Sequence, residues 1–266
     1  MTSTLRDLSA EEGRDAFGRD AANYDAARPA YPDWVFETLT GRCGLKPGAR
    51  LFEIGPGTGQ ATARLLTEGA NPLTAIEPDA RLAAYLRARL PDPALSVVNA
   101  AFEDAELAPE SFDLGTAATS FHWMDQRPAL TKVARVLRRE GWWAAWWNVF
   151  GDPERHDAFH EATDELLNGP ERAQGQDYFA LDTAARLADM AAVDAFGAVH
   201  VDIRKWTLTL STAQMRALYA TYSQFSVLPP DARERLLDGL AEIAERQFGG
   251  RVERNMCTAL YVAQRR

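Results

Sequence analysis

Residues 50–62 read RLFEIGPGTGQAT and join an apolar run to a turn that is rich in glycine. The run RLFEI is typical of a buried strand, and the segment GQATARLL that follows has its apolar residues at helical spacing. Gly55, Gly57 and Gly59 stand between the two, within five residues. Glycine permits backbone conformations and close approaches that a side chain would block. The stretch therefore predicts a strand, a tight turn and a helix, with the bare backbone of the turn facing a ligand.

The same alternation of short apolar runs and helical patterns extends from Ala49 to about Phe150. It predicts an α/β fold, with a parallel sheet and helices on both of its faces. Asp79 is a suitable N-cap for a helix that ends before Pro91, and Gly141 is expected to end the third helix. The expected strands cover 49–54, 72–77, 95–100, 111–120 and 141–149, and the expected helices cover 59–69, 79–90 and 127–140.

The alternation of apolar runs and helical patterns ends after Phe150. A mostly polar, helix-like region of about 45 residues precedes residues 200–211, HVDIRKWTLTLS, whose alternating pattern predicts a long strand. A second helical insertion follows, in which Pro230 and Asp231 mark a helix start, and the apolar run at 257–266 is expected to be the last strand. Both insertions are expected to lie over the carboxyl ends of the strands as a closed cap, which suits a small substrate.

Composition and charge exclude several classes of partner. The 266 residues carry a formal net charge of −9 and no long run of Lys and Arg, so nucleic acid is not expected as a partner. The most apolar segment, residues 141–151, is about half as long as a bilayer span, and the N-terminus has no signal-peptide core. Cys43 and Cys257 fit a reducing compartment and have no metal-binding spacing. We therefore expect a cytoplasmic protein without membrane contact, and both monomer and homodimer remain open.

The glycine turn does not match the common nucleotide-binding motifs. A dinucleotide fingerprint requires a third glycine or an alanine where Gln60 stands, and a P-loop requires a GK[ST] sequence that is absent. Glu53, two residues before Gly55, would place a negative charge beside a pyrophosphate. The turn is better suited to a cationic or zwitterionic ligand.

Residues 53–59, EIGPGTG, resemble motif I, (D/E)xGxGxG, of the class I S-adenosylmethionine-dependent methyltransferases. The chain is similar to the small-molecule branch that includes the trans-aconitate and biosynthetic methyltransferases, over about residues 20–150. The resemblance implies S-adenosylmethionine as the cofactor and a Rossmann-like, mostly parallel, seven-stranded sheet with helical cap insertions. It divides the chain into an N-terminal helical lid segment (1–48), a cofactor-binding core (49–150), a helical cap insertion (151–198), and C-terminal strands with a second helical insertion (199–266).

The resemblance also implies which residues hold the cofactor. Glu77 stands 22 residues after Gly55, where the family places the acid that binds both ribose hydroxyls. The segment NAAFEDAEL resembles the third motif, which contacts adenine. Together these motifs imply a cofactor site formed by Glu53, Gly55, Gly57, Gly59, Gln60, Glu77, Pro78, Ala101, Phe102, Glu103 and Thr119.

Residues 24–32, YDAARPAYP, resemble the N-terminal segment that folds over the methionine end of the cofactor in this family. The resemblance assigns Tyr24 and Arg28 to this lid, with Arg28 as a partner for the methionine carboxylate. In the alternative reading, Arg28 only precedes a proline-initiated helix and lies in solvent.

The acceptor side of the site is expected to follow the fourth and fifth strands. His122 is the catalytic candidate, because a neutral imidazole can take a proton from a hydroxyl or an amine. The alternative is that it packs against the cofactor or satisfies a backbone carbonyl. Trp123, Trp147 and Asn148 are expected to bind the substrate.

The type of acceptor is narrowed by motifs that the sequence lacks. Residues 119–122 read TSFH in place of the (D/N)PP(Y/F) motif of adenine or glutamine amino-group methylation. His156 and His160 have a metal-like spacing without a third ligand, so no metal is expected. The sequence therefore predicts methyl transfer to a small molecule, aligned for in-line displacement. The alternatives are a cofactor-binding protein of the same fold without methyl transfer, such as a pericyclic catalyst or a regulator, and a protein or RNA methyltransferase.

Overall fold

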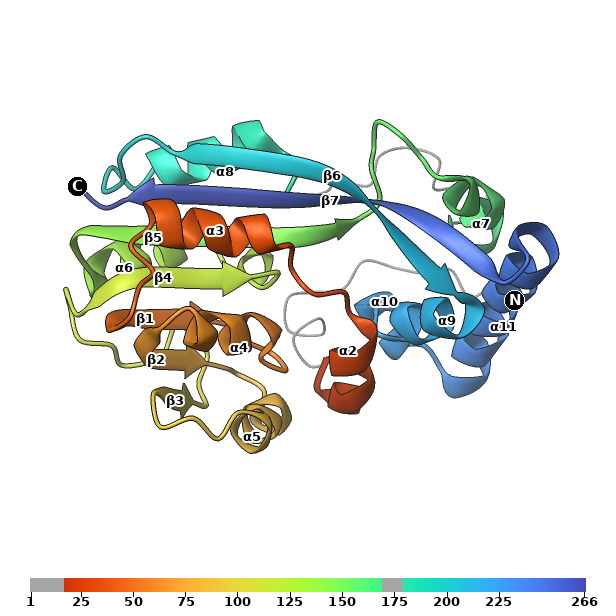
Figure 1. Cartoon of the computed structure of the whole chain (residues 1–266), viewed down its shortest axis with the longest axis horizontal. Helices are drawn as coiled ribbons and strands as arrows, with labels where there is room; N and C mark the ends of the chain where they lie inside the picture. Colours follow the sequence, from red (N-terminus) through yellow and green to blue (C-terminus); the bar gives the residue numbers. More distant parts are fainter. Residues whose placement is uncertain (1–16, 169–178) are drawn as a thin grey trace. The chain divides into compact units, whose positions relative to one another are not determined.

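The computed structural model describes residues 17–168 and 179–266, and it contains a seven-stranded sheet (Figure 1). The strand order is β3-β2-β1-β4-β5-β7-β6. The expected strands are all present, with boundaries that differ by a few residues. They are β1 (Ala49–Ile54), β2 (Ala70–Ile76), β3 (Leu95–Val98), β4 (Phe112–Ala118), β5 (Leu137–Phe150), β6 (His200–Ser211) and β7 (Arg251–Gln264).

The sheet is mixed, because β7 runs against its neighbour β5. Strands β1, β2, β3, β4 and β5 form parallel pairs. At one end of the β5–β7 pair, the Arg265 N–H donates to the Gly141 carbonyl (2.7 Å), and at the other the Thr258 hydroxyl donates to the Asn148 side chain (2.7 Å). The residue numbers of the bonded partners therefore rise along β5 while they fall along β7. The two strands are antiparallel, as Figure 1 also shows. The predicted α/β fold is confirmed.

Helices connect the strands, and their ends follow the sequence signals. The Asp79 carboxylate accepts the Arg81 N–H at the start of the second connecting helix, which ends ahead of Pro91, and Pro230 opens the longest helix. The helices are α2 (Ala21–Ala27), α3 (Asp33–Arg42), α4 (Gln60–Thr67), α5 (Ala80–Arg89), α6 (Gln126–Val136), α7 (Ala158–Asn168), α8 (Thr183–Ala191), α9 (Thr212–Ala220), α10 (Ser223–Ser226) and α11 (Pro230–Phe248), with 3-10 turns η1 (Phe17–Asp20) and η2 (Phe121–Trp123).

The strand order reverses between β1 and β4. From β1 the chain moves outward through β2 to β3, and it then returns to place β4 on the other side of β1. Right-handed crossovers put α4 and α5 on the face opposite α6. In open sheets of this kind, ligands bind outside the carboxyl ends of the strands at the point of reversal. The loops after β1 and β4 are therefore where a site is expected.

One expected helix boundary is wrong. Gly141 does not end the third connecting helix, because α6 ends at Val136 and β5 begins at Leu137. The backbone of Glu140 has a φ angle of +62°, and its N–H donates to the Arg265 carbonyl (3.0 Å). The basic residues before Gly141 therefore belong to the strand, because the backbone here pairs with the end of the chain. The local sequence contains no signal for that pairing.

The chain divides into two compact units, each with its own core. The larger unit has a core of strand and helix residues that includes Leu39, Leu51, Leu73, Leu114 and Trp146, all less than 1% exposed. Of the described residues, the larger unit comprises 30–148, 179–203 and 258–266, and the smaller unit comprises 17–29, 149–168 and 204–257.

The smaller unit combines an apolar cluster with a buried ion pair. Phe159, Tyr219 and Phe225 belong to the cluster, whose helical members come from α7, α9, α10 and α11. The guanidinium of Arg254 donates to both carboxylate oxygens of Asp157 (3.1 and 3.0 Å), and both side chains are less than a tenth exposed. Such a pair fixes the geometry of its elements, since either charge alone would be costly to bury.

No helix in the described part of the chain is both long enough and apolar enough to span a membrane. Cys43 and Cys257 are buried free thiols, and burial raises the pKa of Cys43 to about 12. The Cys43 thiol is therefore protonated and inert at neutral pH.

Candidate active site

The glycine turn joins β1 to α4, and two of its residues show what glycine permits there. Gly55 and Gly57 have φ angles of +62° and +59°, which side chains disfavour. A Cβ on Gly55 would lie 2.6 Å from the Cβ of Ser120, so the loop after β4 packs directly on it. A Cβ on Gly57 would meet no atom of the described residues within 4 Å. Gly57 is thus the position where bare backbone borders open space.

Gly59 has a packing role instead. It is the N-cap of α4, and a Cβ there would lie 2.4 Å from the Leu86 side chain of α5. Gln60 is the first residue of α4 and is half-buried. This close contact packs the start of α4 against α5.

Glu53 is a fully buried acid at the end of β1. Its Oε2 accepts the Thr62 hydroxyl (2.6 Å), whereas Oε1 has no hydrogen-bond partner among the described residues. Burial raises the pKa of Glu53 to about 7; the Thr62 bond opposes this rise, and the charge of Glu77 adds to it. An unpaired buried oxygen of this kind favours a ligand that brings positive charge or a donor.

Glu77 follows β2 and braces the glycine turn. Its Oε2 accepts the Gly57 N–H and its Oε1 accepts the Asp79 N–H, each at 3.0 Å. The side chain is 4% exposed, and this burial raises its pKa to about 7 against the effect of the two N–H groups. The Asn99 amide donates to the carbonyls of Glu77 (2.8 Å) and Pro78 (3.1 Å), which fixes the backbone here. Each carboxylate oxygen of Glu77 keeps a lone pair for a further donor.

The third motif forms a turn after β3. Ala101 accepts the N–H groups of Asp104 and Ala105 through its carbonyl, and the Glu103 side chain is exposed. The structure places Phe102 in the core, because its ring is 2% exposed and stacks on Phe52 with centroids 5.9 Å apart. The buried Phe102 ring therefore anchors this turn, while the residues on either side of it remain accessible.

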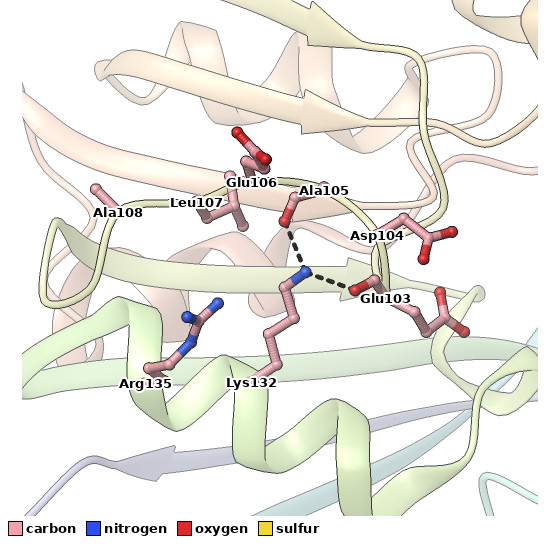
Figure 2. Close-up of a pocket in the computed structure, with 8 residues that line it drawn as sticks. All are labelled: Glu103, Asp104, Ala105, Glu106, Leu107, Ala108, Lys132 and Arg135. Atoms are coloured by element: carbon pink, nitrogen blue, oxygen red, sulfur yellow. Dashed lines mark hydrogen bonds between the residues drawn. The ribbon is translucent and has the colours of Figure 1, made fainter.

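Lys132 of α6 fastens this turn from the side (Figure 2). Its Nζ donates to the carbonyls of Glu103 (2.9 Å) and Ala105 (2.6 Å). An open groove of about 480 Å³ runs between residues 103–108 and the Lys132 and Arg135 side chains. The two bonds hold the turn against α6.

Lys132→Met is expected to lower the free energy of unfolding by about 1–2 kcal/mol, because it removes two charge-assisted bonds to backbone carbonyls. Arg135→Met, in the same groove, is the matched control, since Arg135 is exposed and outside this pair of bonds. Urea unfolding measures both variants. Equal stability of the two would show that Lys132 does not hold the turn.

The loop after β4 meets the glycine turn. The Ser120 hydroxyl donates to the Ile54 carbonyl (2.5 Å) at the end of β1. Thr119 has a φ angle of +53°, and its N–H donates to the Trp146 carbonyl (2.7 Å). Its hydroxyl bonds to that of Tyr31 (3.0 Å). Thr119 is therefore held beside β1 and β5, at the strand-order reversal.

His122 lies in an aromatic group. Its Nδ1 accepts the indole N–H of Trp147 (3.1 Å), and its ring centroid lies 4.6 Å from Trp123 and 5.9 Å from Phe179. Trp147 also contacts Phe179 (5.6 Å) and Tyr261 (6.2 Å). Burial lowers the pKa of His122 to about 4, so the imidazole is neutral at pH 7. The structure thus brings together three of the residues expected on the acceptor side.

Asn148, the fourth of these residues, has a structural role. Its amide donates to the Ala30 carbonyl (3.3 Å), and its Oδ1 accepts the Thr258 hydroxyl (2.7 Å). The side chain is 6% exposed. Asn148 thereby ties the segment before α3 to β5 and β7.

Tyr24 and Arg28 belong to the smaller unit. The Arg28 guanidinium donates to the side chain (2.8 Å) and the carbonyl (3.1 Å) of Thr221. It also lies 4.9–5.1 Å from the ring centroids of Tyr24, Phe150 and Tyr222. Arg28 is therefore engaged in cation–π packing rather than extended into solvent. Its predicted contact with the cofactor carboxylate stays a prediction.

His156 and His160 also lie in the smaller unit, with ring centroids 4.3 Å apart. The His160 N–H donates to the Asp157 carboxylate (2.7 Å), which is committed to Arg254. Within residues 17–168 and 179–266, no group of three or more His, Cys, Asp or Glu side chains is placed to hold a metal ion.

Three residues of this region were not expected from the sequence: Tyr31, Ser120 and Phe179. The signal for Tyr31 is its place between Pro29 and Pro32, which restrict the backbone around it. Ser120 joins the site through a packing contact with Gly55, and Phe179 through a contact with Trp147. Neither contact has a local sequence signature.

Comparison with known proteins agrees with this geometry. A protein family described as a methyltransferase domain matches residues 52–145. An uncharacterized methyltransferase of Mycobacterium bovis is 34% identical over 153 residues. The match covers 56% of this chain and 56% of that protein, so this chain spans about half the length of that relative. An uncharacterized methyltransferase of Schizosaccharomyces pombe is 25% identical over 255 residues, which cover 94% of this chain and 96% of that protein.

A solved structure shares the fold. Phosphoethanolamine N-methyltransferase 2 of Haemonchus contortus, in complex with phosphomonomethylethanolamine and S-adenosylhomocysteine, aligns with a TM-score of 0.60 at 13% identity. The alignment covers 97% of this chain and 60% of that chain. Residues 52–145 therefore match a methyltransferase domain, and the strand order and the glycine turn agree with those of the class I S-adenosylmethionine-dependent methyltransferases. The cofactor of this family is S-adenosylmethionine.

Proposed function

We propose that this protein transfers a methyl group from S-adenosylmethionine to a small-molecule acceptor. The observation that carries the proposal is the pairing of Gly57 with Glu77. The bare Gly57 backbone borders open space, and its N–H bonds to a buried carboxylate that has lone pairs to spare. When bound, the cofactor supplies an electrophilic methyl group on a positively charged sulfur.

The larger unit offers matching groups for the ribose, the adenine and the positive charge of this cofactor. Glu77, with the fixed backbone of Pro78, accepts the two ribose hydroxyls, and the turn that contains Ala101 and Glu103 borders the adenine. Glu53, with its unpaired Oε1, supports the glycine turn and the positive charge of the ligand. Thr119 lies at the side of the turn where β4 ends. These residues bind and orient, and they exclude water from the donor.

A small acceptor is supported by charge and by motif. The net charge of −9 does not suit an RNA backbone, and residues 119–122 do not form the amino-group motif. The fold neighbour from Haemonchus contortus binds phosphomonomethylethanolamine, which is itself a small molecule. His122 and Trp123, which are half-buried beside the buried Trp147, offer aromatic rings to such an acceptor.

Calorimetric titration of S-adenosylmethionine and S-adenosylhomocysteine tests the cofactor, and a labelled methyl donor with a panel of small acceptors tests the transfer. Micromolar binding of both ligands and label in a small product are the expected results. Absence of binding by the folded protein would contradict the proposal. Binding with conversion of a substrate that gains no label would point to the alternative of a cofactor-binding catalyst without methyl transfer.

A further inference from the structure

We infer that His122 acts as a hydrogen-bond donor through Nε2–H, and that the methyl acceptor therefore presents an anionic oxygen, such as a carboxylate, phenolate or enolate. The inference rests on the proposed methyl transfer and adds the chemical class of the acceptor to it. It replaces the expected role of His122 as a general base with that of a donor that orients the substrate.

The first step is the tautomer of the imidazole. The Trp147 indole nitrogen can only donate, and it lies 3.1 Å from His122 Nδ1. Nδ1 must therefore contribute its lone pair. A neutral imidazole carries one proton, which this bond assigns to Nε2. Nε2–H is then a donor with no hydrogen-bond partner among the described residues.

The second step is that Trp147 cannot readily release this bond. Its side chain is 5% exposed and packs edge to face on Tyr261. The Tyr261 hydroxyl donates to the Ala180 carbonyl (2.7 Å), and the Arg186 guanidinium lies 3.4 Å from the centroid of Phe179. These contacts hold the rings around Trp147 in place. His122 could act as a base through Nδ1 only if its hydrogen bond with the Trp147 indole broke, and the packing of Trp147 opposes that.

The third step is position. His122 lies two residues after Ser120, whose hydroxyl bonds to the Ile54 carbonyl beside the glycine turn. Nε2–H therefore belongs to the loop that borders the proposed cofactor site, among the faces of Trp123 and Phe179. A fixed neutral donor matches an acceptor oxygen. An oxygen that is already anionic has no proton to lose, so His122 orients it without moving a proton.

The decisive readout is the tautomer, measured by ¹⁵N NMR of histidine-labelled protein. The chain has four histidines, and the signals that disappear in His122→Gln identify His122. The expected result is a protonated Nε2 and an unprotonated Nδ1 at pH 7. A proton on Nδ1 would overturn the inference, and it would do so whether or not the protein transfers methyl groups.

Two pairs of variants test the donor role. His122→Gln places an amide near Nε2, whereas His122→Asn places one near Nδ1, so Gln is expected to retain about tenfold more kcat/KM than Asn. Trp147→Phe keeps a ring but frees both tautomers, and we expect about a tenfold loss of kcat/KM with unchanged affinity for S-adenosylhomocysteine. Equal activity of His122→Gln and His122→Asn would overturn the donor role.

An acceptor panel separates this inference from the proposed function. Carboxylates and phenols are compared with primary and secondary amines, with a labelled methyl donor. Label in the oxygen acceptors supports the inference. Label only in amines overturns it while the proposed methyl transfer stands. If cofactor binding fails, the proposed function fails, and the NMR measurement still decides the tautomer.

Discussion

Replacing Glu77 with alanine is expected to lower the affinity for S-adenosylmethionine by about a hundredfold to ten-thousandfold. A buried carboxylate that accepts two hydroxyl groups contributes two charge-assisted hydrogen bonds of about 1.5–3 kcal/mol each. Calorimetry measures the loss, and Glu77→Gln, which keeps the size and one acceptor oxygen, is expected to fall between alanine and the wild type.

The control for this change is Glu106→Ala, which removes an exposed acid near the end of the third motif, after the residues assigned to adenine. Its affinity for the cofactor should equal that of the wild type. Unchanged affinity in Glu77→Ala would contradict the assignment of Glu77 to the ribose, because no other described acid at the end of β2 is buried against the glycine turn.

The raised pKa of Glu77 gives the same residue a pH signature. In an unfolded chain a Glu carboxyl has a pKa of about 4.3, whereas burial raises it to about 7 in the folded protein. The folded state therefore binds more protons between these values, and the free energy of unfolding falls as the pH rises through this window. Cofactor affinity should rise over the upper part of it, because ribose hydroxyls donate best to the ionised carboxylate. Glu77→Gln should remove the contribution of Glu77 to the pH dependence of the free energy of unfolding and to that of the cofactor affinity.

Gly57→Ala is expected to lower cofactor affinity by up to about a hundredfold, because overpacking a close contact costs about 1–3 kcal/mol. The added Cβ would meet no atom of residues 17–168 and 179–266 within 4 Å, so it would occupy space that the proposed ligand needs. Thermal unfolding and calorimetry are measured together. The variant should fold, with a loss of about 1–2 kcal/mol from a side chain at positive φ.

Gly48→Ala is the matched control for Gly57→Ala. Gly48 has a φ angle of +83°, and a Cβ there would also meet no atom within 4 Å in the part of the chain that the structure describes. Both variants should lose similar stability, but only Gly57→Ala should lose cofactor affinity. Equal affinity in the two would mean that the open space beside Gly57 is not the cofactor site.

The sequence predicts the parts of this fold that depend on local order. The spacing of Gly55, Gly57 and Gly59 and the position of Glu77 depend on one strand, one turn and the next strand. These signals lie within 25 residues of each other, from Glu53 to Glu77. Periodicity also predicts the order of the strands and helices, since each element carries its own apolar pattern.

The parts that the sequence does not predict depend on contacts between distant residues. β5 begins four residues early because the backbone around Glu140 pairs with Arg265 at the end of the chain. Phe102 lies in the core because Phe52 of β1 offers a stacking face. His122 has the pattern of a general base in the sequence, and only the approach of Trp147 from β5 assigns its proton. Each of these outcomes requires the tertiary fold.

The contact of Ser120 with Gly55 has a consequence for divergence and engineering. The loop after β4, which carries residues proposed for the acceptor side, meets the glycine turn at this serine, through its Cβ and through its bond to Ile54. Residues beyond it can be exchanged to accommodate a new acceptor without redesigning the donor side, provided that position 120 stays small and hydroxylated. A graft that begins at residue 121 would therefore keep the packing of the glycine turn, whereas one that begins at residue 119 would have to rebuild that packing.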